Sequence, residues 1–135
     1  KEKLLLKRNH RLTNIRKNYL NQTISEIINR KPRFICIEDL NVSGMMKNRH
    51  LSKAVQAQGF FWFRKQLEYR CSDKGIQLIV ADRFYPSSKL CSCCGNIKKD
   101  LKLSDRVYRC ACGNMIDRDF QASINLKTYG EQFAS

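Results

Sequence analysis

Residues 91–95, Cys-Ser-Cys-Cys-Gly, and residues 110–113, Cys-Ala-Cys-Gly, are two short motifs that decide the fold of the second half of this 135-residue chain. Each ends on a Cys-Gly step, and 15 residues separate Cys94 from Cys110. Cysteines so close in sequence are poorly placed for disulfides and well placed as metal ligands. Glycine permits a turn that points backbone N–H groups at the sulfurs. The spacing predicts a four-cysteine zinc ribbon with the ligands Cys91, Cys94, Cys110 and Cys112.

The ligand set leaves one alternative open. Cys93 is an extra candidate, and the second motif has C-x-C spacing where C-x₂-C is commoner, so Cys93 can exchange with one ligand. Four protein ligands leave zinc no open position, so this metal is predicted to be structural and a catalytic metal must lie elsewhere. Free thiols indicate a reducing compartment, the cytoplasm or nucleoid of a prokaryote. Cys36 and Cys71 are expected to be buried and inert.

The charge balance points to a polyanionic partner. Lys and Arg number 26 against 12 Asp and Glu, a net charge of +14. No apolar run approaches the ~20 residues that a membrane-spanning helix needs. The expected partner is therefore nucleic acid rather than a membrane.

Hydrophobic periodicity predicts an α/β fold. The expected elements are helices over residues 1–30, 51–73 and 117–130, and buried strands over 33–38 and 76–81. Two such strands joined by a helical crossover predict a right-handed parallel unit. We expect a sheet to cover the apolar stripe of the first helix and the aromatic patch at 60–63 to lie in the core, with a polar connection over 39–49.

Two carboxylates occupy positions typical of active sites. Glu38 ends the first predicted strand, and Asp119 opens the last helix. Parallel sheets place active residues at the carboxyl ends of their strands, where paired carboxylates can hold Mg²⁺. Carboxylates at such positions are also common as solvated groups or helix caps, so composition leaves both readings open.

Five segments together resemble a known family. In chain order they are Ile37-Glu-Asp-Leu-Asn41, Phe63-Arg-Lys-Gln-Leu-Glu-Tyr69, Arg83-Phe-Tyr-Pro-Ser-Ser-Lys89, the two cysteine motifs, and Asp117-Arg-Asp-Phe-Gln-Ala-Ser-Ile-Asn125. Over about residues 8–130 they resemble the C-terminal half of the OrfB/TnpB family of transposon-encoded, RNA-guided DNA nucleases, which are related to the type V CRISPR effectors.

The resemblance implies a partial RNase H-like (RuvC) fold with the zinc ribbon inserted. It implies that Glu38 and Asp119 bind catalytic Mg²⁺, and that the partners are DNA and guide RNA. Gln121 stands where the family usually has Asn. Asp117 is a candidate helper, and Arg118 a candidate phosphate contact.

The family's first catalytic aspartate lies on an earlier strand that is not among these residues. We therefore expect the chain to be a fragment or part of an assembly, inactive alone, with another polypeptide supplying the missing strands and aspartate. The expected organisation is a nuclease part over 1–85, a ribbon insertion over 86–116 and a helix over 117–135 that completes the nuclease part.

Two other functions remain. One is an inactive zinc-ribbon module that only binds nucleic acid, and metal-dependent cleavage separates it from a nuclease. The other is a zinc-stapled protein adaptor, for which a charge of +14 is an unusual surface. Salt-dependent binding of single-stranded DNA would count against an adaptor.

Overall fold

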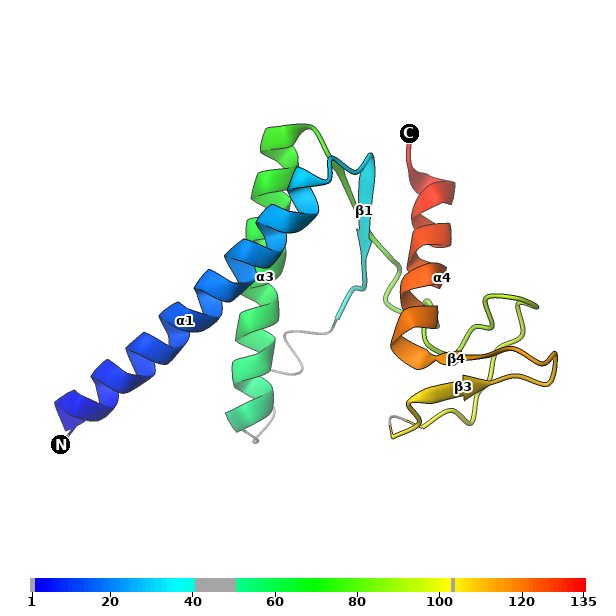
Figure 1. Cartoon of the computed structure of the whole chain (residues 1–135), viewed down its shortest axis with the longest axis horizontal. Coiled ribbons are helices and arrows are strands. Elements are labelled where there is room, and N and C mark those ends of the chain that lie inside the picture. Colours follow the sequence, from blue (N-terminus) through cyan, green and yellow to red (C-terminus); the bar gives the residue numbers. More distant parts are fainter. Residues whose placement is uncertain (1, 41–50, 103) are drawn as a thin grey trace. The chain divides into compact units, whose positions relative to one another are not determined.

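The computed structural model describes residues 2–40, 51–102 and 104–135, with the backbone alone at residue 9 and at 51–58. The chain divides into two compact units. One holds the helices α1 (Glu2–Asn29) and α3 (Leu51–Lys74). The other holds two small sheets and the helix α4 (Arg118–Phe133) (Figure 1). The predicted connection over 39–49 lies mostly outside the described residues.

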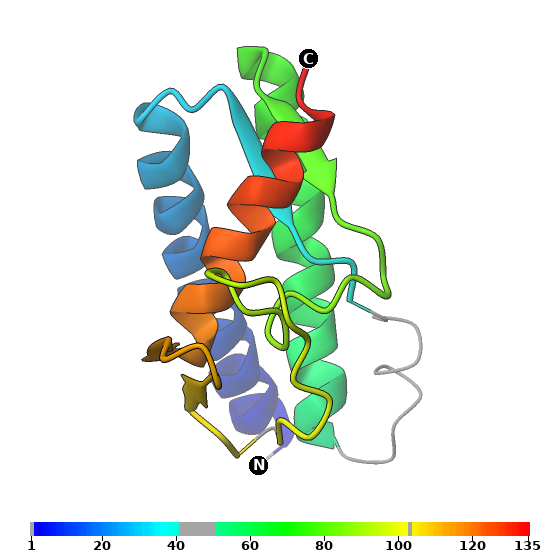
Figure 2. The ribbon, with the colours of Figure 1, turned by 90° about the vertical axis from the view of Figure 1, so that its right-hand side faces the viewer.

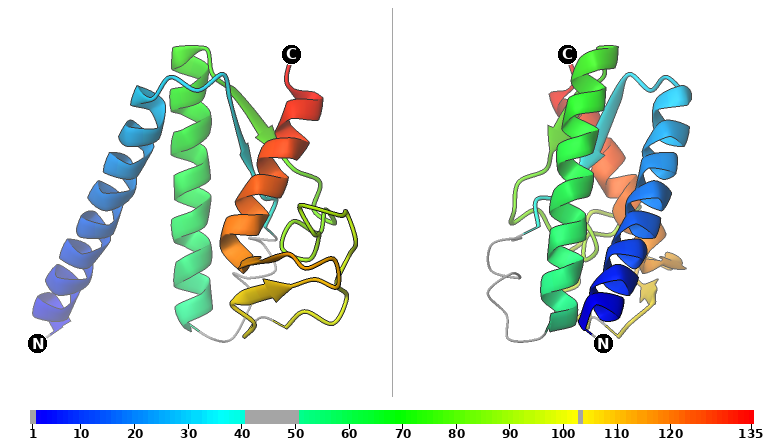
Figure 3. Two further views of the ribbon diagram at one scale, coloured as in Figure 1. Left: turned by 45° about the vertical axis from the view of Figure 1, so that its right-hand side comes forward. Right: turned by 90° about the vertical axis from the view of Figure 1, so that its left-hand side faces the viewer.

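The helical unit is a pair of helices in contact near the end of α1 (Figure 3). Ile24 and Ile28 of α1 and Leu67 and Cys71 of α3 are buried. The Arg70 guanidinium donates hydrogen bonds to Ser25 Oγ at 2.9 Å and to the Asn21 carbonyl at 3.3 Å. Both helices begin and end within a residue or two of their predicted bounds. Gly75, with φ of 69°, follows the end of α3 as expected.

Helix α3 leaves much of the apolar stripe of α1 uncovered. Leu12, Ile15 and Tyr19 are 53%, 54% and 69% exposed. Within the helical unit, α1 contacts α3 toward its C-terminal end (Figure 1). The aromatic patch of α3 is likewise only partly buried, since Phe61 is 49% exposed and Phe60, Trp62 and Phe63 are intermediate.

The second unit begins with two short paired strands, β1 (Phe34–Ile37) and β2 (Gln77–Val80). The Gln77 N–H donates to the Arg33 carbonyl at 3.5 Å, and the Ala81 N–H to the Ile37 carbonyl at 2.9 Å. The constant offset between partners is the pattern of parallel strands, as predicted. All four residues of β1 are half-buried rather than fully buried.

Helix α4 lies along β1 (Figures 1 and 2). Gly130 makes this approach possible, because a Cβ there would lie 2.5 Å from Phe34 Cε2 and 3.0 Å from Cys36 Cβ. Asp117 is the N-cap of α4, accepting a hydrogen bond from the Phe120 N–H at 3.0 Å. The predicted start of this helix is therefore confirmed.

The segment between β2 and α4 forms two small hairpins. An isolated bridge joins Leu90 and Ile97, and β3 (Val107–Arg109) pairs antiparallel with β4 (Met115–Asp117). Tyr108, Leu101 and Cys91 form its buried cluster. Within the described part of the chain, no helix is both long and apolar enough to cross a membrane.

Candidate functional site

The sulfurs of Cys91, Cys94, Cys110 and Cys112 form one cluster, and all four Sγ atoms lie within 4.8 Å of one another. Cys91 Sγ is 3.7 Å from Cys112 Sγ, and Cys94 Sγ is 3.5 Å from Cys110 Sγ. Four sulfurs bound tetrahedrally to zinc at about 2.3 Å lie about 3.8 Å apart. The donor set therefore fits a tetrahedral thiolate-binding metal ion.

Two glycine turns build this cluster. Gly95 and Gly113 have φ of 79° and 97°, in the left-handed region that favours glycine. The Gly95 N–H donates to the Cys91 carbonyl at 3.0 Å, and the Gly113 N–H to the Cys110 carbonyl at 3.0 Å. These similar turns shape the two cysteine motifs, residues 91–95 and 110–113, which we call knuckles. The second knuckle has one residue fewer between its cysteines. The structure thus accommodates the C-x-C spacing.

Hydrogen bonds prepare the cluster for negative charge. Burial raises the pKa of the Cys91 thiol, but donation by the Cys94 and Cys93 backbone N–H groups and the Asn114 amide outweighs burial and lowers this pKa to about 6. The Asn114 N–H lowers the pKa of Cys112, whereas the Cys110 thiol, burial and the other thiols raise it to about 12. The site accepts one thiolate readily, and further thiolates need a cation beside them.

The remaining cysteines stay outside the cluster. Cys93 is exposed. Cys71 is buried and Cys36 half-buried, and burial raises the pKa of both thiols. Thiols of raised pKa are poor nucleophiles, in line with the expected inert role.

Two buried side chains hold the ribbon in place. The Tyr108 hydroxyl, fully buried, donates to the Lys89 carbonyl at 2.8 Å. Gln121 of α4 is also fully buried, and its Oε1 accepts hydrogen bonds from the Ser92 N–H at 3.2 Å and the Asn114 amide at 3.0 Å. The residue that departs from the family pattern therefore joins α4 to both knuckles.

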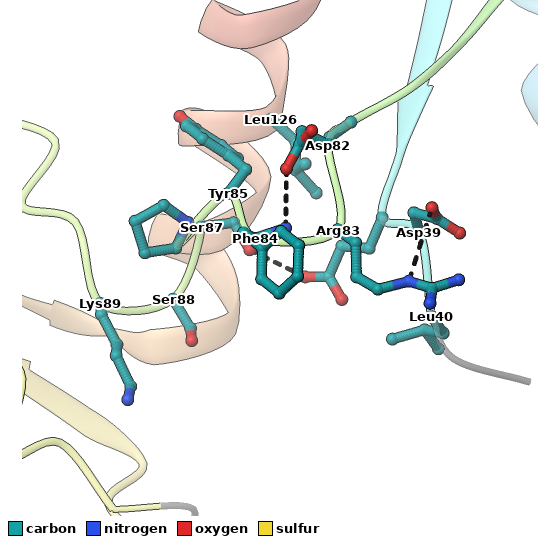
Figure 4. A pocket seen from close by; sticks show the side chains of 13 residues that line it. Asp39, Leu40, Asp82, Arg83, Phe84, Tyr85, Ser87, Ser88, Lys89 and Leu126 are labelled. Atoms are coloured by element: carbon teal, nitrogen blue, oxygen red, sulfur yellow. Dashed lines mark hydrogen bonds and ion pairs between the residues drawn. The ribbon is translucent and has the colours of Figure 1, made fainter. Parts of the chain in front are cut away.

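A pocket of about 330 Å³ lies where β1 and β2 end (Figure 4). The segments 38–40 and 81–89 line it, together with Leu126. Its position at the carboxyl ends of parallel strands is the one predicted for Glu38. Asp39 forms an ion pair of 3.9 Å with Arg83, and Asp82 Oδ1 accepts the Phe84 N–H at 2.9 Å.

Glu38 has a defined partner in this pocket. Its Oε1 accepts a hydrogen bond of 2.9 Å from the hydroxyl of Ser87, which is buried. Asn125 of α4, also buried, donates through Nδ2 to the carbonyls of Ser87 at 2.7 Å and Leu90 at 2.8 Å. Hydrogen bonds thus connect Glu38, the loop after β2, and α4.

Asp119 is placed differently. Its side chain is 87% exposed, forms an ion pair of 3.6 Å with Arg118, and is not among the residues that line the pocket. Arg118 also donates to the Lys102 carbonyl at 3.4 Å. Among the described residues, the four cysteines are the one group of three or more ionisable ligands close enough to hold an ion. The structure therefore gathers the four cysteines into one cluster, and Asp119 is not among the residues that line the pocket beside Glu38.

The sequence motifs indicate no role for Ser87 or Asn125, and Gln121 stands out in them only because the family usually has Asn there. A further signal was present, because Gln121, Asn125 and Tyr129 recur every four residues and so share one face of α4. Tyr129 continues this pattern, since its hydroxyl accepts the Asp82 N–H at 3.1 Å. A polar stripe on an otherwise apolar helical face indicates hydrogen bonds to a packed loop.

A parallel strand pair, its covering helix and, between them in sequence, four clustered cysteines define an α/β fold whose inserted segment is suited to binding a metal ion. Residues 60–126 match the family "Cas12f1-like, TNB domain". The chain is 37% identical to a Streptomyces pristinaespiralis protein named as an RNA-guided DNA endonuclease, over 89% of this chain and 30% of that protein. It is 29% identical to a Mycobacterium tuberculosis protein of the same description, over 93% of this chain and 28% of that one.

A solved structure has a similar fold. The cryo-EM structure of the Cas12f1-sgRNA-target DNA complex matches with a TM-score of 0.59 and 16% identity, over 84% of this chain and 32% of that chain. The chain therefore shares this part of the Cas12f1 fold. Its match to the Cas12f1-like TNB family and to relatives named as RNA-guided DNA endonucleases confirms the predicted resemblance to the OrfB/TnpB family. The chain spans about 30% of the length of these relatives.

Proposed function

We propose that this chain forms the C-terminal part of an RNase H-like (RuvC) nuclease domain in an RNA-guided DNA endonuclease. In this proposal a zinc ribbon over 86–116 is inserted between nuclease parts over 1–85 and 117–135. The relatives named as RNA-guided DNA endonucleases support this assignment.

The observation that carries the proposal is the place of Glu38. It follows β1 directly, at the carboxyl edge of a parallel strand pair, and it lines a pocket. Carboxylates at such an edge are the usual ligands for divalent ions in phosphodiester hydrolysis. Glu38 also accepts one hydrogen bond from the hydroxyl of Ser87, a buried residue.

The oxygen donors of this pocket fit a hard cation such as Mg²⁺. Glu38 is the carboxylate we assign as a ligand here, because it directly follows β1 and lines the pocket. Asp119 is the second proposed ligand, at the start of α4. Bound Mg²⁺ would activate water and stabilise charge on the phosphate. The two carboxylates would hold it in place.

The third acidic ligand implied by the family is proposed to come from a further polypeptide segment, so this chain alone is expected to be inactive. The partners are proposed to be DNA and guide RNA, in line with the net charge of +14 and with the sgRNA and target DNA in the Cas12f1 structure. The compartment is proposed to be the cytoplasm, at the nucleoid.

Zinc is proposed as the ion of the four-cysteine cluster, with a structural role. All four positions would be protein sulfurs, so zinc would have none free for substrate. It would fix the two knuckles, the first of which donates a hydrogen bond to Gln121 through the Ser92 N–H.

A second function is favoured by one observation. Asp119 is 87% exposed and does not line the pocket, as expected for a vestigial carboxylate in a module that only binds nucleic acid. Divalent-metal-dependent cleavage of target DNA by the assembled nuclease, lost on removal of Glu38, separates the nuclease from the binding module.

A further inference from the structure

We propose that Ser87 is a positioning residue for the Glu38 carboxylate and that Asn125 holds Ser87 in place. This inference rests on the proposed role of Glu38 as a metal ligand. It concerns how this chain's own residues prepare that ligand.

The contact between Ser87 and Glu38 is well suited to orienting a carboxylate. The Ser87 hydroxyl is 2.9 Å from Glu38 Oε1, within the usual range for a hydroxyl donor. Ser87 is 6% exposed, so water competes little for this bond. Within the described residues, no other group donates to Glu38, and its second oxygen remains available for a cation.

Ser87 is itself fixed from three directions. Its N–H donates to the Tyr85 carbonyl at 3.0 Å, and Pro86 before it has a restricted φ. Its carbonyl accepts the Asn125 Nδ2 at 2.7 Å. A hydroxyl held in this way presents its proton at a constant place.

Asn125 is fixed in turn. Its backbone carbonyl accepts the Tyr85 hydroxyl at 3.1 Å, and its Nδ2 also donates to the Leu90 carbonyl, directly before the first knuckle. Asn125 is 4% exposed, so both bonds are shielded from water. The same amide therefore supports the loop that holds Glu38 and the base of the ribbon.

A glutamate side chain has several rotatable bonds, and ordering it for metal binding costs conformational entropy. A hydrogen bond that orders the carboxylate beforehand removes part of that cost from the binding step. Removing such an outer partner typically weakens metal affinity about 10–100-fold. Ser87→Ala should therefore weaken divalent-cation binding at Glu38 by about 10-fold or more.

The test titrates the 135-residue chain with Mn²⁺ and follows paramagnetic broadening of the Glu38 and Asp39 backbone amide resonances. The variants are Ser87→Ala, Ser87→Thr, which keeps the hydroxyl, and Glu38→Gln. Ser123→Ala is the matched control, because that exposed hydroxyl bonds only the Phe120 carbonyl within α4. Thermal unfolding of each variant is measured in parallel.

We expect Ser87→Ala to bind Mn²⁺ about 10-fold more weakly, and Ser87→Thr and Ser123→Ala to bind like the parent chain. If Glu38→Gln abolishes the broadening but Ser87→Ala binds like the parent, the positioning role is wrong and the metal-ligand role stands. If the parent chain shows no broadening at Glu38, or Glu38→Gln leaves it unchanged, Glu38 is not a metal ligand in this chain and the positioning role falls with it.

Discussion

Gln121 Oε1 accepts the backbone N–H of Ser92 at 3.2 Å, joining the first turn of α4 to the first cysteine knuckle. The same oxygen accepts the Asn114 amide at 3.0 Å, while Gln121 Nε2 has no hydrogen-bond partner among the described residues. The Gln121 side chain thus accepts hydrogen bonds from both ends of the cysteine-containing segment.

Gln121→Leu should destabilise the fold by roughly 1–3 kcal/mol, because it leaves the Ser92 N–H, the Ser92 hydroxyl and the Asn114 amide without their buried acceptor. Urea unfolding measures the change. Gln132→Leu, at an exposed position of the same helix, is the control and should stay within about 0.5 kcal/mol. Equal effects from the two variants would show that Gln121 does not hold the ribbon.

Tyr108→Phe should lower stability by about 1 kcal/mol, because it removes the hydrogen bond of 2.8 Å to the Lys89 carbonyl and keeps the ring. Tyr69→Phe, on an exposed tyrosine, is the matched control. Thermal unfolding compares them. A loss no larger for Tyr108→Phe than for the control would contradict the role given to the hydroxyl.

The purified chain should contain one zinc ion, measured by elemental analysis. Replacing Cys91 and Cys112 together with serine should abolish zinc binding, because each removes one of four clustered sulfurs. Cys93→Ser should keep the zinc, since Cys93 is exposed and outside the cluster. Loss of zinc in Cys93→Ser, or its retention in the double variant, would refute the ligand assignment.

Binding of single-stranded DNA should weaken steadily as salt rises, because basic side chains replace counterions on the phosphates. Fluorescence anisotropy at several salt concentrations gives the slope of log affinity against log salt. A slope near zero would favour the adaptor function instead.

The predictable features were those with a strong periodic or spacing signal. The long helices over 2–29 and 51–74 and the two parallel strands appear close to their expected bounds. The cysteine spacing also predicted which four sulfurs lie together. Each signal is local, so tertiary contacts had little scope to change it.

Features that the sequence did not predict are short or depend on contacts between distant segments. β3 and β4 have three residues each, too few for a periodic pattern to indicate them. Ser87 and Asn125 act through hydrogen bonds across 38 residues of sequence, which no local rule reveals. Periodicity also does not say how far along a helix its partner extends, so the part of α1 that α3 leaves exposed could not be predicted.

The most direct test measures Mg²⁺-dependent cleavage of target DNA by the complete guide-bound assembly containing this chain. Glu38→Ala and Asp119→Ala should each abolish cleavage while the zinc content stays unchanged and the chain stays folded, because each removes a proposed metal ligand and little core volume. Asp73→Ala, at an exposed helix end, should cleave like the parent. Near-parental cleavage by the Glu38→Ala, Asp119→Ala double variant would contradict the assignment of these two carboxylates to the nuclease site.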